Sequence, residues 1–327
     1  MFRYIAIPLA ALLALAAVVS AEDGDGGYAA PFLQIPVGAR PSGMGGAFLA
    51  ISDDGAAAFF NPAGVAGLRK VLFSTSYRLM DLDRTLGYAS LTFPTRGNSA
   101  LGFSWLYAGS GSVAARNDDG DQLGFDLNQH NHVFSVIFAK RFEDWFAAGF
   151  RGSYLHTRFA EMSAFTVSFD LGLMFYFSQL VSRETRDLMA VQDIQGGLVV
   201  RNLAATYRWN NEDYLNAHTT TDLFSDQKDR VPLEVGVGGS ARFFKRKLVI
   251  AADLLKNEHQ SFVAHAGAEF FISPQFAARG GYSDKHLTAG TGYVFKIGAR
   301  TLAIDYAFST DKVDEGSEHI FSFDMLF

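Results

Sequence analysis

The carboxyl-terminal segment Ile320–Phe327 constrains the fold more than any other stretch of this chain, because apolar and polar residues alternate along it. The apolar face carries Phe321, Phe323, Met325 and Phe327. A terminal strand with one apolar face and an aromatic carboxyl end is typical of a transmembrane β-barrel, whose last strand closes on its first. We therefore predict that Phe321, Phe323 and Phe327 serve barrel assembly.

The amino terminus has the pattern of a secretory signal peptide. Arg3 precedes an apolar run from Ile5 to Val19, and the small residues Ser20 and Ala21 follow it. The run is about 15 residues long, whereas a spanning helix needs about 20. The alternative is a membrane-anchoring helix. We expect residues 1–21 to be removed and the mature chain to be exported.

Composition excludes some classes of partner. The 327-residue chain is 49% apolar, contains 31 Phe and no Cys, and carries a net charge of −6. An exported chain without cysteines does not depend on disulfides for stability. The negative net charge argues against a nucleic-acid partner.

From Val71 onward the chain alternates in stretches of about ten residues separated by turn residues, which is the pattern of membrane strands. We predict fourteen antiparallel strands. They are Val71–Arg78, Leu86–Phe93, Ser99–Ala108, His132–Lys140, Trp145–Thr157, Phe165–Phe177, Ile194–Arg201, Val231–Phe243, Lys247–Leu255, Phe262–Phe271, Phe276–Ser283, Thr288–Ile297, Thr301–Phe308 and Ile320–Phe327.

Alternation also fits a soluble β-sandwich, so the lengths of the links decide between the two folds. Short links alternate with longer ones, as expected for periplasmic turns and outer loops of a barrel. The longest outer links are 109–131 and 202–230. The link 178–193 is an exception, and it holds either a short helix over 183–190 or an unrecognised hairpin. The pattern favours an all-β transmembrane barrel in the outer membrane of a diderm bacterium.

Fourteen strands enclose a lumen that wall side chains alone do not fill. The Gly-rich segment 22–68 precedes the first strand and is suited to pack inside the lumen as irregular backbone. The chain then divides into a signal peptide (1–21), an N-terminal hatch (22–68) and a transmembrane barrel (69–327).

Two runs in this segment carry a specific resemblance. They are Pro36-Val37-Gly38-Ala39-Arg40-Pro41-Ser42-Gly43-Met44-Gly45-Gly46-Ala47-Phe48-Leu49-Ala50 and Asp53-Asp54-Gly55-Ala56-Ala57-Ala58-Phe59-Phe60-Asn61-Pro62-Ala63-Gly64-Val65-Ala66. They resemble the N-terminal region of the FadL-like outer-membrane barrels, in the form of the PorV/PorQ branch. The resemblance implies fourteen strands and a lumenal hatch. In FadL-like transporters hydrophobic molecules pass the hatch and leave sideways through the wall, whereas PorV-type proteins receive secreted proteins at the cell surface.

The resemblance also assigns the gate. By resemblance, the hatch turn of the family corresponds to Asn61-Pro62-Ala63. These residues suit a turn, because Pro62 disfavours the helical region for Asn61 and the Asn61 amide can then bond neighbouring backbone. Phe59 and Phe60 either contact a ligand or wedge the hatch against the wall. The complete set predicted for the gate and hatch is Phe59, Phe60, Asn61, Pro62, Ala63 and Gly64, with the hatch glycines Gly43, Gly45 and Gly46.

Charged residues at the polar positions of the strands are predicted to face the lumen, because each would be costly against lipid. The predicted lumen charges are Arg151, Asp170, Arg201, Glu234, Asp253, Arg279 and Asp305. We expect them to form a lattice that binds the hatch to the wall.

Other motifs carry little chemistry. His130 and His132 share a strand face and could bind a metal, but no third ligand is near in sequence, which favours a structural role at a loop end. The run 117–121 could bind calcium weakly, yet it lacks the EF-hand spacing and favours a plain acidic turn. No Ser, His and carboxylate set supports catalysis. We expect no enzyme activity, no metal and no cofactor.

Three functions remain open. The first is passage of hydrophobic, fatty-acid-like molecules across the outer membrane. The second is PorV-like docking or shuttling for a type IX-like protein secretion system, with the loops 109–131 and 202–230 as the contact surface. The third is an exported soluble β-protein. The expected partners are outer-membrane lipid, the barrel assembly machinery, and either a hydrophobic small molecule or secreted proteins.

Overall fold

The computed structural model describes residues 28–116, 119–160, 162–182, 184–185, 190–210, 228–283, 286–310 and 316–327. The predicted signal peptide and the first residues of the predicted hatch, 22–27, lie outside the described residues. No helix in these ranges combines the length and apolar character needed to cross a membrane.

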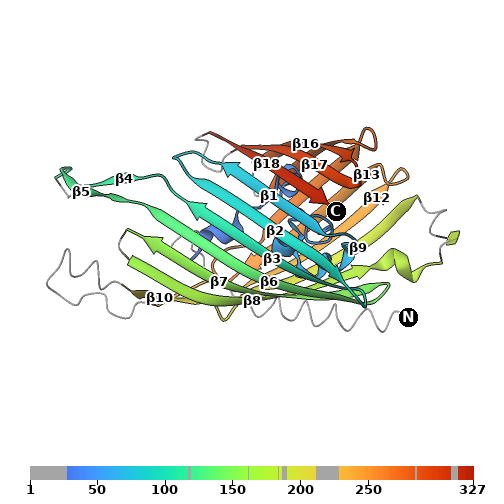
Figure 1. Ribbon diagram of the computed structural model, residues 1–327, viewed down its shortest axis with the longest axis horizontal. Helices are drawn as coiled ribbons and strands as arrows, with labels where there is room; N and C mark the ends of the chain where they lie inside the picture. Colours follow the sequence, from blue (N-terminus) through green and yellow to red (C-terminus); the bar gives the residue numbers. More distant parts are fainter. Residues whose placement is uncertain are drawn as a thin grey trace.

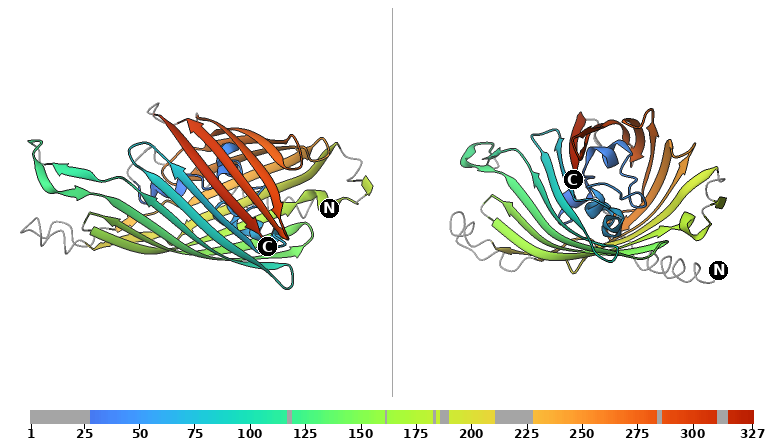
Figure 2. Two further views of the ribbon diagram at one scale, coloured as in Figure 1. Left: turned by 45° about the horizontal axis from the view of Figure 1, so that its top comes forward. Right: turned by 45° about the vertical axis from the view of Figure 1, so that its right-hand side comes forward.

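Fourteen antiparallel strands form a closed barrel (Figures 1 and 2). The strands of the ring are β1 (Leu72–Leu79), β2 (Thr85–Thr95), β3 (Ser99–Gly109), β6 (Gln129–Glu143), β7 (Phe146–Phe159), β8 (Met162–Tyr176), β9 (Val191–Leu203), β12 (Glu234–Phe243), β13 (Leu248–Asn257), β14 (Val263–Phe271), β15 (Phe276–Ser283), β16 (His286–Ile297), β17 (Arg300–Thr310) and β18 (Ser317–Leu326). Pairing of β1 with β18 and of β8 with β9 closes the ring. Every predicted strand is present within a few residues of its expected ends, so the barrel is confirmed and the sandwich is wrong.

The described parts of the two longest links contain four further strands, where no strand was predicted. β4 (Val113–Arg116) and β5 (Gln122–Leu127) pair with each other and extend beyond the rim of the barrel (Figure 1). β10 (Thr206–Asn210) and β11 (Lys228–Arg230) add to the edge of β8 beyond β9. These strands are only three to six residues long, so their alternation is too brief to distinguish from a loop.

The two faces of the wall have opposite character. On β8, Phe165 and Leu171 are exposed, whereas Thr166 and Asp170 are buried toward the lumen. Because successive side chains of a strand point to opposite faces, the apolar residues of the whole strand form an outward band. An apolar outer face with a polar interior is the arrangement that a membrane requires of a barrel.

Placing an arginine at Leu171 should impair insertion. Leu171 faces outward in the middle of β8 with 48% of its surface exposed, and a basic residue at the bilayer midplane costs roughly 2–4 kcal/mol. Folding into lipid vesicles, followed by gel mobility of unheated samples, would measure the loss. Ser163→Arg, also outward but at the rim end of the same strand, should cost no more than about 1 kcal/mol. Equal folding of both variants would contradict the assigned depth.

The terminal strand pairs as its alternation predicts. The register of β1 with β18 runs from Leu72–Leu326 to Leu79–His319, and the Phe327 N–H donates to the Val71 carbonyl at 3.0 Å. The Arg300 guanidinium lies 5.2 Å from the centre of the Phe327 ring. The role of Phe321, Phe323 and Phe327 in assembly stays a prediction.

Residues 28–68, which we call the N-terminal segment, occupy the lumen (Figure 2, right). The segment contains the short helices η1 (Pro31–Gln34), α2 (Ala39–Gly43), α3 (Ala57–Phe60) and η2 (Pro62–Gly67). Helix α2 packs against β15–β18, and η2 packs against β3 and β6–β8. Met44, Phe48 and Leu49 are buried. The hydrophobic core therefore lies between the segment and the wall.

The long link between β8 and β9 begins with η3 (Phe177–Leu180). The helix considered for 183–190 falls mostly outside the described residues. The described part of this link contains no hairpin.

Candidate functional site

The turn between α3 and η2 is centred on Asn61, which is fully buried. Its backbone is extended (φ −149°), and its side-chain oxygen accepts the Ala63 N–H at 3.1 Å. Its Nδ2 donates to the carbonyls of Leu49 (3.1 Å) and Leu173 (3.0 Å). Leu49 belongs to the N-terminal segment and Leu173 to β8. One side chain therefore fixes the turn and ties it to both the segment and the wall.

Asn61→Ala should loosen this turn without unfolding the barrel. The change removes all three bonds and leaves the buried Leu49 carbonyl without its Asn61 donor, at a cost of about 1–3 kcal/mol. Hydrogen exchange of the amides in 57–67 should accelerate, while exchange in the wall strands stays unchanged. Asn61→Asp keeps the acceptor for Ala63 and loses both donors. Protection equal to that of the native chain in both variants would contradict the role of Asn61.

The two phenylalanines before Asn61 have different surroundings. Phe60 meets the rings of Phe48 and Phe59 edge-on, with centroids 5.4 and 5.3 Å apart. The Phe59 ring lies near the guanidinium carbons of Arg151 (5.7 Å) and Arg201 (5.9 Å). Both rings are therefore buried in one hydrophobic cluster, and Phe59 in addition borders the charged side chains of the lumen. Contact of either ring with a ligand stays a prediction.

Two wall arginines bind the carbonyl end of α3. Arg151, from β7, donates to the Ala58 carbonyl at 3.2 Å, and Arg201, from β9, donates to the Phe60 carbonyl. The last carbonyls of a helix have no partner within it, so they are open to such donors. Asp170 pairs with Arg151 and Glu234 pairs with Arg201. Both charges are therefore neutralised while they hold the segment.

The other predicted lumen charges also bind the segment or one another. Asp253 accepts the N–H groups of Phe48 (2.6 Å) and Leu49 (2.8 Å). Arg279 donates to Asp305 at 2.6 Å and to Glu269 at 2.7 Å. The structure thus brings all seven predicted charges to the interior face.

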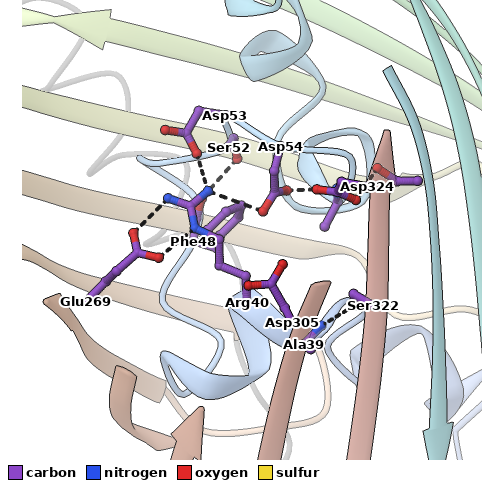
Figure 3. A network of polar contacts seen from close by, with 12 residues as sticks. Ala39, Arg40, Phe48, Ser52, Asp53, Asp54, Glu269, Asp305, Ser322 and Asp324 are labelled. Atoms are coloured by element: carbon purple, nitrogen blue, oxygen red, sulfur yellow. Dashed lines mark hydrogen bonds and ion pairs between the residues drawn. The ribbon is translucent and has the colours of Figure 1, made fainter. Parts of the chain in front are cut away.

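Figure 3 shows a larger ionic cluster around Arg40, at the start of α2. Arg40 donates two bonds of 2.9 Å to Glu269, one of 2.6 Å to Asp53 and one of 3.3 Å to Asp54. Glu269 is completely buried and also receives Arg279. Arg40 and the two aspartates belong to the runs singled out in the sequence, but their pairing was not predicted. Glu269 could have been found by its polar-face position in 262–271.

Burial and neighbouring charges shift the pKa values of Arg40 and Asp54 in the N-terminal segment. Burial disfavours the charged form of Arg40, but Asp53 and Glu269 hold its pKa well above the ordinary value. Burial, with Asp53 nearby, raises the pKa of Asp54 to about 6, although Arg40 and the Ala56 N–H favour its ionised form. Arg40 is therefore a permanent cation that anchors the segment to β14.

Glycines in the wall let the segment approach the strands closely. A Cβ at Gly281 would lie 2.2 Å from the Gly45 nitrogen, and one at Gly172 would lie 2.1 Å from the Asn61 side-chain oxygen. The same holds at other lumenal positions, namely Gly149, Gly197 and Gly267. Since these contacts are with backbone or a buried amide, larger residues would displace the segment.

The predicted hatch glycines lie at the end of α2. Gly45 and Gly46 have φ values of +64° and +81°, a region that favours glycine. The Gly45 carbonyl lies 2.7 Å from Nδ1 of His265. A Cβ at Gly43 would lie 3.2 Å from the Gly290 Cα. These residues turn the chain tightly against β15 and β16. In η2, a Cβ at Gly64 would lie 2.3 Å from the Ser52 carbonyl.

The wall ladder between β8 and β9 is irregular over residues 166–170 and 201–206, which we call the seam, although Phe169 and Leu203 within it still pair. The register shifts between Phe169 and Leu171. Asp170 accepts the Asn202 N–H at 2.9 Å, and the Thr166 hydroxyl accepts the Thr206 N–H at 3.0 Å. Side chains thus replace backbone carbonyls as acceptors. The alternation of each strand does not reveal such a break.

A small pocket joins the seam to the gate turn. It is about 10 Å³ in volume, which is space for roughly one water molecule. Its lining includes Tyr28, Phe59, Arg151, Arg201, Asn202 and Val231. In this conformation, the pocket does not hold a hydrophobic molecule.

The remaining candidates lie on the outer face. Nδ1 of His132 accepts the Trp105 indole N–H at 3.3 Å, and Nδ1 of His130 lies 2.9 Å from the Tyr107 hydroxyl. In the described ranges no three metal-ligand side chains form a group. The acidic run 117–121 begins outside the described residues.

Several solved structures share this fold. The chain is similar to a FadL homologue from Pseudomonas aeruginosa (TM-score 0.57, 13% identity, covering 86% of this chain and 95% of that one). It is also similar to the toluene transporter TodX of Pseudomonas putida, with a TM-score of 0.59 and 12% identity over 94% of this chain and 98% of that one. The toluene transporter TbuX of Ralstonia pickettii matches with a TM-score of 0.59 and 13% identity over 89% of this chain and 98% of that one. No protein-family model matches the chain, and no curated protein matches its sequence. At these identities the likeness shows the fold; these similar proteins are described as transporters or a FadL homologue, not as enzymes.

Proposed function

We propose that this chain passes hydrophobic small molecules across the outer membrane, with the N-terminal segment as a hatch that gates the lumen. The proposal rests on one observation: the same wall residues bind both helix α3, beside the gate turn, and the seam. Arg151 and Arg201 hold the carbonyl end of α3, while Asp170 binds both Arg151 and the Asn202 N–H of the seam. Movement of α3 would therefore disturb the part of the wall where the ladder is already irregular.

The proposed route runs through the small pocket, past Phe59, to the seam. Asn202 lines the pocket and also belongs to the seam, so the two are adjacent. Because the pocket holds about one water molecule, passage requires that α3 and Phe59 move first. At the seam, the outer face of β8 exposes Phe169 and the adjacent outward residue Leu171, which would contact lipid. A molecule leaving there would enter hydrocarbon, which favours an apolar substrate.

The similar structures support this class of substrate. TodX and TbuX are toluene transporters, and the third similar protein is a FadL homologue. The FadL-like form of the hatch sequence points the same way. Monoaromatic hydrocarbons and fatty acids are therefore the first molecules to test.

A disulfide across the seam tests the proposal, and the chain has no cysteine of its own. Phe169 and Leu203 are register partners on β8 and β9, so Phe169→Cys with Leu203→Cys should allow a bridge. Oxidation should reduce uptake of labelled toluene or oleate by cells about tenfold, and a reductant should restore it. The control pair is Leu173→Cys with Leu198→Cys, partners below the seam, whose oxidation should change nothing. Undiminished uptake in the oxidised seam variant would reject the exit route.

A second function, PorV-like docking of secreted proteins, is favoured by the β4–β5 hairpin, which extends beyond the barrel rim (Figure 1). The form of the hatch sequence also belongs to the PorV/PorQ branch by resemblance. Native mass spectrometry of the protein extracted from its own membrane separates the two functions. A bound apolar molecule released on denaturation favours transport. A stoichiometric protein partner with an empty lumen favours docking.

A further inference from the structure

Basic and aromatic side chains form two rows across the outer face of neighbouring strands. In the first row, register partners follow one another from β3 to β11. Its members are Tyr107, His132, His156, Phe165, Arg208 and Lys228. The second row lies one pleat nearer the loops and contains Gly109, His130, Arg158, Ser163 and Asn210. We call these two rows together the basic belt.

The belt faces away from the lumen. On β7 the buried residues are Leu155 and Thr157, so the alternating positions His156 and Arg158 point outward. Arg158, Arg208 and Lys228 are exposed. The ends of β6, β7, β8 and β10 that carry the belt lie side by side in Figure 1.

The belt lies at the outer boundary of the apolar band. On β6, the outward residues between His132 and Lys140 are Phe134, Val136 and Phe138, all exposed and apolar. Phe142, with Trp145 and Phe146 nearby, marks the aromatic girdle at the turn end. About ten residues separate Phe142 from His132, which at a tilt of about 40° corresponds to roughly 25 Å along the membrane normal. That is the height of the apolar band of an outer-membrane barrel, so the belt lies at headgroup level.

The charge of the belt has one sign. Among the described residues of the two rows none is a carboxylate, whereas Arg158, Arg208 and Lys228 are cations and three histidines add imidazole donors. The aromatic rings beside them, such as Trp105 and Tyr107, hold His132 and His130 by hydrogen bonds. Charge complementarity at this depth therefore selects an anionic group that sits at the lipid surface.

We propose that the basic belt binds the phosphate groups of outer-leaflet lipids. The apolar band beneath it would pack against the acyl chains of the same lipid molecules, since Phe134 and Phe165 lie directly below or within the belt. A soluble anion would gain nothing from those rings. The basic belt thus fits a lipid with a phosphorylated headgroup, and this inference does not depend on what the lumen transports.

The test uses the full-length mature protein in mild detergent and counts bound lipid by native mass spectrometry. The probes are lipid A with both phosphates, the same glycolipid without phosphates, and phosphatidylcholine. The protein should retain lipid A about tenfold better than either of the other lipids. The triple variant Arg158→Gln, Arg208→Gln, Lys228→Gln should lose about tenfold of that retention.

Lys256→Gln is the matched control. Lys256 faces outward at the corresponding end of β13, away from the belt, with its ammonium 5.0 Å from the centre of the Phe262 ring, and its loss should leave retention unchanged. Equal retention of phosphorylated and dephosphorylated lipid would overturn the proposal, as would full displacement of lipid A by millimolar inorganic phosphate. If the triple variant fails to fold, as judged by unheated gel mobility, the comparison of the three lipids on the native chain still decides.

Discussion

Gly281→Val is expected to force the N-terminal segment off the wall and open the lumen to ions. A Cβ at this position would lie 2.2 Å from the Gly45 nitrogen and 2.3 Å from the Met44 carbonyl carbon. Both atoms are backbone, so no side chain can rotate away, and overpacking of this kind costs roughly 1–3 kcal/mol or more. Valine suits a strand, so the wall itself should persist. Single-channel recordings in planar bilayers should show frequent, large open events where the native chain is mostly closed.

The adjacent glycine provides the control. Gly280 is on the same strand and is exposed on the outer face. A Cβ at Gly280 would lie 4.0 Å from its nearest neighbour, the Thr288 carbonyl oxygen, which is an ordinary contact. Gly280→Val should therefore leave the recordings unchanged. If the two variants conduct alike, contact between β15 and the segment does not seal the lumen.

Arg40→Met is expected to release the same segment by removing its central cation. The variant leaves Glu269, which is fully buried, with Arg279 as its remaining cation, and it leaves Asp53 and Asp54 without Arg40. Removing one partner of a buried ion pair costs roughly 3–5 kcal/mol because the other charge stays desolvated. The segment should become sensitive to protease at concentrations that leave the native chain intact, and the barrel should keep its unheated gel mobility.

Arg242→Met separates this effect from a general loss of charge. Arg242 also binds Asp53, at 3.0 Å, but its side chain is 28% exposed. Partly exposed pairs contribute about 1 kcal/mol or less. Protease sensitivity of Arg242→Met should therefore stay near that of the native chain. Equal sensitivity of the two variants would mean that Arg40 is not the anchor.

The two predictions test two different contacts that hold the N-terminal segment against the wall. Gly281 concerns the steric fit of the segment against β15, and Arg40 concerns its ionic anchor on β14. If the segment is the hatch of a transporter, either change should also increase leakage of polar solutes into cells. If the variants leak polar solutes but the native chain takes up no hydrophobic molecules, the segment is a hatch but the transport function is wrong.

The sequence was sufficient to predict the strands of the barrel. The alternation that marks β8, for example, depends only on neighbouring residues, because the side-chain period of a strand is two. The same parity placed Arg151, Asp170 and Arg279 on the lumenal face. The turn at Asn61-Pro62 was assigned by resemblance, and the local restriction on the residue before proline supports it.

The partners of these residues could not be predicted in the same way. Arg40 and Glu269 are 229 positions apart, and they meet only because the segment enters a closed ring. The need for glycine at Gly172 and Gly281 becomes visible only when the backbone of the segment lies against them. Neither contact leaves a periodic pattern in the chain.

Local sequence therefore accounts for the number of strands, their two faces and the turn at Asn61, since each follows from the geometry of adjacent residues. Closure of the ring determined which charged residues pair and where the ladder between β8 and β9 is irregular. It also placed His132, His156 and Arg208 in one row across neighbouring strands. Register between strands and contact across the lumen depend on every strand of the ring, so no single stretch of the chain specifies them. A shift of one residue in register would exchange the lumenal and lipid faces of a strand, although its own sequence would be unchanged.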